Sequence, residues 1–181
     1  MEKISGKIIS SEAAVAALFF GLISGGYIFI NNYIVGLDAQ ILAGAVGIIL
    51  WLAKFVGCIL LMRFFMKKLM RSYEGVERNQ LLGYGTLIAL FSSIITAACS
   101  YVAVQYVFPD ITKTAFDTMY QSMGAMLDSN STAMLEKMEA HYASISLWTN
   151  LIWCFVYGWL LSVIMSSTLA NKKNIFDDDD I

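Results

Sequence analysis

The sequence predicts an all-α integral membrane protein, with four transmembrane helices and a short amphipathic helical hairpin on the outer face between helices three and four. Of its 181 residues, 58% are apolar and only 14% are charged, and there is one proline. A soluble domain of this size needs more charge to cover its surface, whereas lipid-facing helices need none. Four apolar runs are long enough to cross a hydrocarbon core of about 30 Å, which takes about 20 helical residues.

We expect these spans at about residues 13–35, 41–62, 80–108 and 145–170 of a single domain that covers 1–181. Helix is the expected state, because runs of this length without alternation do not resemble the strands of a barrel. The first run follows Lys3 and Lys7, as the apolar core of a signal peptide would. It is longer than such a core and carries Glu12 at its start, so we expect it to be retained as a span.

Basic residues are distributed unevenly between the segments that flank the spans. One side holds nine of them: Lys3, Lys7, Arg63, Lys67, Lys68, Arg71, Arg78, Lys172 and Lys173. The other side holds two, Lys113 and Lys137. Because lysine and arginine favour cytoplasmic loops, we expect both termini, and a basic elbow at 63–79, in the cytoplasm.

Lys54 lies inside the second span, about 12 Å from its expected cytoplasmic end at 1.5 Å per residue. An unpaired charge at that depth costs at least about 3 kcal/mol, so its side chain should face protein or water. Small residues lie near the same helical face, namely Gly44, Gly47, Gly57 and Cys58. Hydroxyl side chains at similar depth in other spans are Thr86, Ser92 and Ser162. Two interpretations stay open: a structural lysine that reaches Glu12 or helix-end carbonyls, or a polar site or conduction path inside the bundle.

The segment at about 112–143 is predicted to form two short amphipathic helices. Apolar residues recur there at helical spacing: Phe116, Met119, Tyr120, Met123, Met126 and Leu127, then, after "DSNS", Met134, Leu135, Met138 and Tyr142. Methionine suits an adaptable contact surface. Thioether and imidazole ligands also suit Cu(I), for which the candidates are Met123, Met126, Met138 and His141. The acidic segment 174–181, which ends in "DDDDI", is expected to be a disordered tail.

Catalytic motifs are not found in the sequence. The three cysteines, Cys58, Cys99 and Cys154, all fall within expected spans and are far apart along the chain, which argues against a disulfide framework or a zinc site. Gly83 and Gly85 are too few for a phosphate-binding loop, and small residues in membrane helices more often allow close helix packing. The same applies to Gly21 and Gly25. We therefore expect no cofactor and no enzymatic activity.

The order of parts resembles a known family. A short turn joins the first two spans, the basic elbow "RFFMKKLMRSYEGVERNQ" leads into "LLGYGTLIALFSSIITAACSYVAVQYVFPD", and "GWLLSVIMSSTLANKK" closes the last span. This layout, with Gly83, Tyr106, Pro109 and the closing lysines, is similar to a family of small four-span bacterial inner-membrane proteins catalogued as a domain of unknown function (4199 type). The resemblance implies a multi-pass protein of the bacterial cytoplasmic membrane and carries over no site residue.

From these patterns we expect a non-enzymatic accessory or assembly subunit that acts through protein–protein contacts. The alternatives are a small channel or transporter with a polar site around Lys54 and Glu12, and copper handling at the outer hairpin. The expected partners are the lipid bilayer and a membrane protein or a second copy of the chain, and nucleic acid is not among them.

Overall fold

A computed structural model describes residues 4–36, 40–73, 75–123 and 128–177, and their side chains except those of 40–43 and 170–177. This part of the chain is helical and contains no strand. The elements are α1 (Gly6–Val35), α2 (Gln40–Ser72), α3 (Arg78–Val102), the π-helical turn η1 (Ala103–Val107), α4 (Pro109–Met123), α5 (Ser129–Ala140) and α6 (Tyr142–Asp177). The predicted all-α fold class is thus confirmed.

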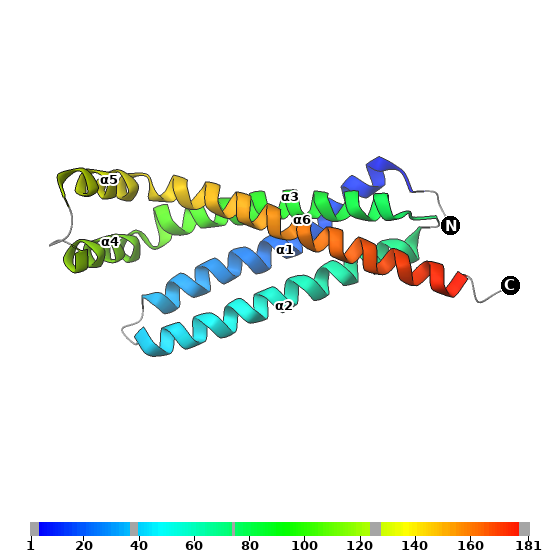
Figure 1. Cartoon of the computed structure of the whole chain (residues 1–181), viewed down its shortest axis with the longest axis horizontal. Helices are drawn as coiled ribbons and strands as arrows, with labels where there is room; N and C mark the ends of the chain where they lie inside the picture. Colours follow the sequence, from blue (N-terminus) through cyan, green and yellow to red (C-terminus); the bar gives the residue numbers. More distant parts are fainter. Residues whose placement is uncertain (1–3, 37–39, 74, 124–127, 178–181) are drawn as a thin grey trace.

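Four helices within the described residues are long and apolar enough to cross a membrane: α1, α2, α3 with η1, and α6. They form an elongated bundle in which α1 begins and α6 ends at the same end, whereas α4 and α5 lie at the other end (Figure 1). We call these the terminal end and the α4–α5 end. The basic side chains of Lys7, Lys67, Lys68 and Arg71 belong to the terminal end.

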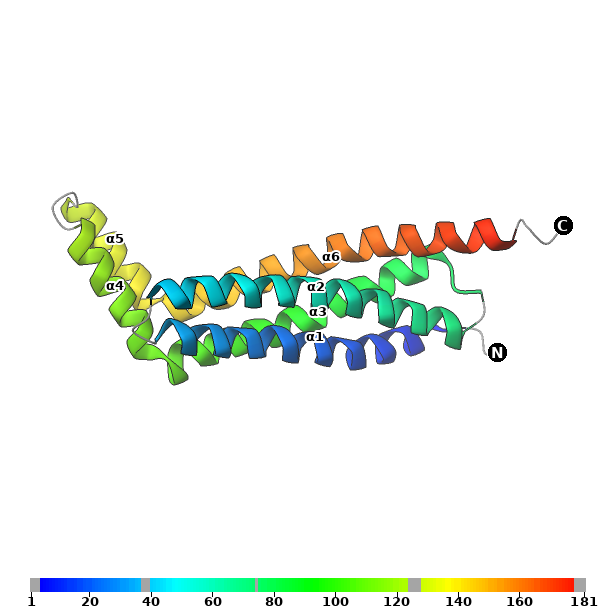
Figure 2. The ribbon, with the colours of Figure 1, turned by 90° about the horizontal axis from the view of Figure 1, so that it is seen from below.

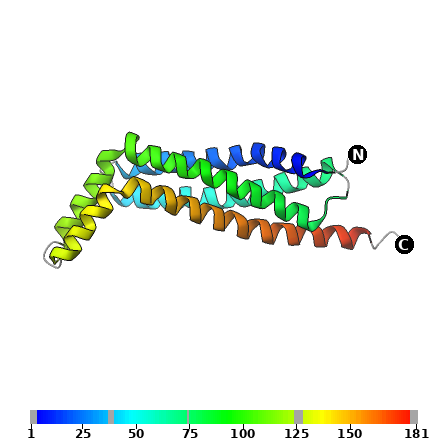
Figure 3. The same ribbon diagram turned by 90° about the horizontal axis from the view of Figure 1, so that it is seen from above.

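Helices α4 and α5 lie side by side and are inclined to the bundle axis (Figures 2 and 3). The change of direction follows η1, where the Phe108 N–H donates to the Ala103 carbonyl at 2.8 Å, and Pro109 then starts α4. Asp128 caps α5 by accepting the Ser131 N–H at 2.7 Å, and this hydrogen bonding to Ser131 lowers the pKa of the Asp128 carboxyl.

Helix α3 is central in the bundle and packs along both α1 and α6. Small residues permit the close approach. A Cβ on Gly21 would lie 2.6 Å from the Ile95 side chain, and one on Gly25 would lie 2.7 Å from Cys99 Sγ. On the other side of α3, a Cβ on Gly85 would collide with the Ser162 side chain. The close packing expected at Gly21, Gly25 and Gly85 is therefore present. At Gly83 it is not, because nothing lies within 4 Å of a Cβ built there.

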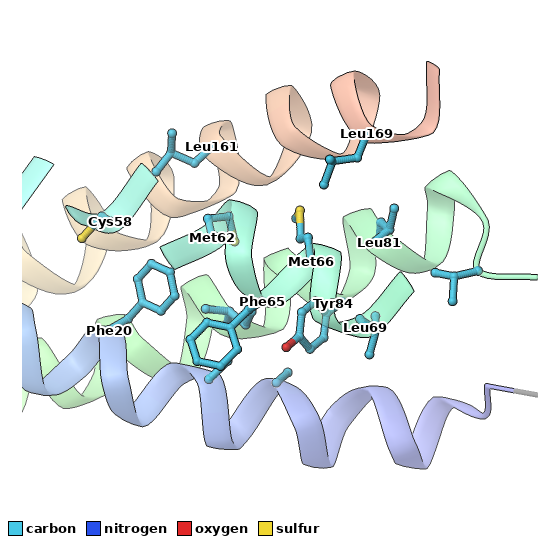
Figure 4. Close-up of a cluster of buried hydrophobic side chains, with 14 residues drawn as sticks. Phe20, Cys58, Met62, Phe65, Met66, Leu69, Leu81, Tyr84, Leu161 and Leu169 are labelled. Carbon is cyan, nitrogen blue, oxygen red and sulfur yellow. The ribbon is translucent and has the colours of Figure 1, made fainter. Parts of the chain in front are cut away.

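Helix α2 continues through most of the segment that the sequence analysis interpreted as a basic elbow. It ends at Ser72. The buried side chains of Phe65, Met66 and Leu69 explain why the chain remains helical beyond residue 62. These apolar residues recur at helical spacing and join a core cluster with Met62, Leu81 and Tyr84 at the terminal end (Figure 4). Expecting an elbow from residue 63 was wrong, because the charged residues of this stretch occupy only the outward face of a helix.

Helices α1 and α6 also extend beyond their apolar runs. Helix α1 begins at Gly6, after Ser5 whose hydroxyl accepts the Ile8 N–H at 3.4 Å. Helix α6 continues to Asp177, whereas a disordered tail was expected from residue 174. The remaining residues of that expected tail, 178–181, lie outside the described residues.

Candidate functional site

A cavity of about 290 Å³ lies within the bundle, between α1, α2, α3 and α6. Most of its lining is apolar or aromatic, including Trp51, Phe55 and Tyr157. Lys54 is the one charged side chain among the described residues that line it.

The Lys54 side chain is half-buried and lies against an aromatic ring of α1. Its Nζ is 4.7 Å from the centroid of the Tyr27 ring, which is a cation–π geometry. Within the described part of the chain, no carboxylate forms an ion pair with this ammonium group. The aromatic contact therefore offsets only part of the cost of holding a charge inside the bundle.

The expected contact between Lys54 and Glu12 is wrong. Glu12 lies instead beside Lys68, with Lys68 Nζ 3.9 Å from Glu12 Oε2. Lys68 follows Lys54 by 14 positions on α2, which corresponds to about 21 Å along a helix. Because α2 remains helical as far as Ser72, Glu12 is level with the terminal end and not with the cavity.

Of the three hydroxyl residues expected near Lys54, one lines the cavity. Ser92 does so and donates to the Ala89 carbonyl at 3.2 Å. Thr86 and Ser162 both donate to the Leu82 carbonyl, at 2.8 and 3.1 Å, and are not part of the lining. The expected small-residue packing surface around Lys54 is also wrong at Gly44 and Gly57, because nothing lies within 4 Å of a Cβ built there.

Several polar residues of the site escaped the sequence analysis. Ser24, Thr96 and Asn150 line the cavity, and Asn150 Nδ2 donates to Ser100 Oγ at 2.9 Å. Ser100 and Ser146 are joined by a hydrogen bond of 2.6 Å between their hydroxyls, so this cluster fastens α3 to α6. An asparagine in an apolar run was the available signal for Asn150, and nothing in the sequence indicated its partners.

A second hollow of about 950 Å³ adjoins the cavity toward the α4–α5 end. Trp51 lines both spaces, and the larger one is also lined by Tyr27, Asn31, Asp110 and Thr114. Toward the terminal end the situation differs. There Phe20, Met62, Ile88 and Leu161 line the cavity and also belong to the buried core cluster. The cavity is therefore bounded by packed side chains at one end and by a further hollow at the other.

The cysteines divide between two places. Cys58 and Cys154 line the cavity from α2 and α6, whereas Cys99 lies at the α1–α3 contact opposite Gly25. All three are free thiols. Among the described residues there is no group of three or more histidine, cysteine, aspartate or glutamate side chains placed to hold a metal ion.

The copper candidates lie on α4 and α5 or beside them. Met123 ends α4, Met138 is on α5, His141 follows α5, and Met126 lies outside the described residues. The methionines of these helices are exposed: Met119, Met123, Met134 and Met138. Phe116 is buried instead, and its ring packs against that of Tyr142, with 5.5 Å between the two ring centroids.

The comparison with protein families decides the affiliation of the chain. The model of the family described as "Protein of unknown function (DUF4199)" matches residues 15–171. The chain belongs to this family. The match covers the last three spans of this DUF4199 protein in full and the first span from Val15 onward, so it includes Lys54 and excludes Glu12. No curated protein and no solved structure matches the chain.

Proposed function

We propose that this multi-pass membrane protein is non-enzymatic and binds a small ligand in the cavity beside Lys54. The observation that carries the proposal is that a half-buried lysine, Lys54, lines the cavity, while its ammonium group has an aromatic ring as its contact. A charge inside a bundle is costly and marks a binding or transport site by default. The described lining residues offer a cation, hydroxyls, an amide and thiols, all of which can bind a polar group of a ligand.

A binding site or a small transporter fits this cavity better than an open channel does. A channel needs a continuous polar route, but the core cluster at Met62 and Ile88 bounds the cavity toward the terminal end. A transporter in one of its states has one closed end and a site near the middle of the bundle. The polar site around Lys54 therefore takes precedence over the conduction path.

Native mass spectrometry after gentle extraction tests the proposal. We expect bound small molecules on the wild-type protein and their loss from Ser92→Phe, which places a ring in the cavity. Ile94→Phe is the matched control, because Ile94 is on the same helix and 51% exposed. Wild-type protein that is folded but free of adducts would contradict the proposal, as would equal adducts on both variants.

A second candidate function is that of an accessory or assembly subunit. It is favoured by the exposed methionines of α4 and α5, in a region where Phe116 is the buried side chain of α4. Methionine suits a surface that adapts to a membrane-protein partner or to a second copy. Replacing Met119, Met123, Met134 and Met138 by serine should abolish co-purification of the partner and leave the thermal unfolding midpoint unchanged.

Retained co-purification would count against the subunit proposal, and the variant Thr114→Ser serves as a control for an exposed change on α4. Titration of wild type and the same methionine variant with Cu(I) tests the copper interpretation. Submicromolar binding that the variant loses would favour metal handling there.

For the location, we propose the bacterial inner membrane with the terminal end in the cytoplasm. The support is the nine-to-two distribution of lysine and arginine between the two sides, together with the start of α1 and the end of α6 at the basic end of the bundle (Figure 1).

A further inference from the structure

We propose that the ligand is a single-chain amphiphile with an anionic headgroup, and this inference rests on the proposed ligand site. The headgroup binds at Lys54. The hydrocarbon chain lies against the apolar floor of the cavity, formed by Phe20, Met62 and Leu161, and along the aromatic seam of Phe55 and Tyr157 between α2 and α6. Carboxylate and phosphate headgroups share the required charge.

The charge of the lining selects the headgroup. Lys54 supplies one positive charge, and the described lining residues supply no negative one. Asp110 lines the adjoining hollow and not this cavity. The Ser92 and Thr96 hydroxyls donate to carbonyls of their own helix, at 3.2 and 2.8 Å, so Lys54 provides the principal donor for an anion.

The remaining lining selects a hydrocarbon chain. Phe20, Met62 and Leu161 form an apolar floor toward the terminal end. Along the seam between α2 and α6, the rings of Phe55 and Tyr157 are 5.4 Å apart. Trp153 on α6 lines the cavity and is 68% exposed, so the seam faces the surrounding lipid. A ligand that arrives through the bilayer can therefore reach the cavity laterally.

The small size of the cavity favours a ligand with one hydrocarbon chain. Its volume is about 290 Å³. A headgroup and the first part of one chain fill this space, and the rest of a longer chain lies in the seam.

Tryptophan quenching by a brominated fatty acid tests the inference on the full chain in phosphatidylcholine nanodiscs. In a Trp148→Phe, Trp159→Phe background, the remaining tryptophans are Trp51 and Trp153, which both line the cavity. We expect 9,10-dibromostearate to give a saturable quenching component that unbrominated stearate displaces. The neutral probe 9,10-dibromostearyl alcohol should give only the linear component of bilayer partitioning.

Variants of Lys54 test whether the saturable quenching depends on this residue. Lys54→Met should weaken the saturable component at least tenfold, and Lys54→Arg should retain it within threefold. Lys68→Met is the control, because Lys68 is a basic residue of the same helix that does not line the cavity. The thermal unfolding midpoint of each variant verifies that it is folded, and Lys54→Gln, which also removes the charge, replaces Lys54→Met in the test if that variant does not fold.

Each contrary outcome has a distinct meaning. Saturable quenching by the alcohol that is independent of Lys54 overturns the anionic headgroup and leaves the proposed ligand-binding function intact. Displacement of the bromostearate by acetate or inorganic phosphate as effectively as by stearate overturns the hydrocarbon chain. Absence of any saturable component overturns the amphiphile, and absence of adducts in native mass spectrometry in addition overturns the ligand-binding function itself.

Discussion

Lys54 combines a charge that is costly inside a bilayer with an aromatic contact that offsets part of the cost. Insertion scales put the cost at about 3 kcal/mol, and a cation–π contact such as that with Tyr27 contributes about 0.5–2 kcal/mol. The balance disfavours a purely structural role for the charge. Within the described residues Lys54 has no carboxylate partner, in contrast to Lys68, whose Nζ lies 3.9 Å from Glu12 Oε2.

Replacing Lys54 by methionine should therefore leave the thermal unfolding midpoint in detergent unchanged or raise it. Lys54→Glu should lower it, because a carboxylate loses the attraction to the Tyr27 ring. Adding Glu12→Lys to Lys54→Glu should not restore stability, since the new lysine would face Lys68. In the matched pair, Glu12→Lys with Lys68→Glu should behave like wild type. Recovery in the first double variant would reinstate the Lys54–Glu12 contact.

Among the helices, α3 depends most on the absence of side chains in its neighbours. Gly21 and Gly25 of α1 admit Ile95 and Cys99 of α3, and Gly158 of α6 admits Ala89. Without a hydrophobic driving force between helices in lipid, such close contact is a main source of association. The position of α1, and hence of Tyr27 beside Lys54, is set by this packing.

The pair Gly21→Ala and Gly26→Ala tests this dependence. A Cβ at Gly21 would lie 2.8 Å from Ile95 Cβ, which cannot move without its backbone, whereas nothing lies within 4 Å of one at Gly26. We expect Gly21→Ala to destabilise by about 1–3 kcal/mol through overpacking. Gly26→Ala should be neutral or stabilise by up to about 1 kcal/mol. Equal midpoints in thermal unfolding would show that α1 and α3 adjust without cost.

At the scale of the whole molecule, the bundle is closed at one end and hollow at the other. The core cluster, which includes Met66, Leu69 and Tyr84, lies at the terminal end. The cavity beside Lys54 and the adjoining hollow lie toward the α4–α5 end. The orientation of the bundle in the membrane determines which compartment the larger hollow faces. The orientation that we propose from the distribution of basic residues places the hollow on the outer side.

Cysteine labelling on intact spheroplasts tests that assignment. With the three native cysteines replaced by alanine, single cysteines are introduced at Ser72, at the end of α2, and at Ser129, at the start of α5. Both positions are exposed and lie on different ends of the bundle. An impermeant maleimide should label Ser129→Cys and spare Ser72→Cys until the cells are lysed. The reverse pattern would invert the proposed orientation.

The four spans could be predicted because the length and apolarity of a helix that crosses a membrane do not depend on its partners. The partners of individual side chains could not. Whether Lys54 reaches Glu12 or Tyr27 depends on the tilt and register of α1 against α2, and these follow from contacts such as that of Gly21 with Ile95. The helical course of α2 past residue 62 was readable from the spacing of Phe65, Met66 and Leu69, but the charges between them masked it.

The packing gradient along the bundle also has a mechanical consequence. Close-packed protein is nearly incompressible, whereas side chains that line an open space lack contacts on one side. In this molecule the cavity of about 290 Å³ and the adjoining hollow of about 950 Å³ lie toward the α4–α5 end, and the core cluster packs the terminal end. The terminal end is therefore the stiffer of the two, and the side chains around Lys54 and Trp51 have more room to change rotamer.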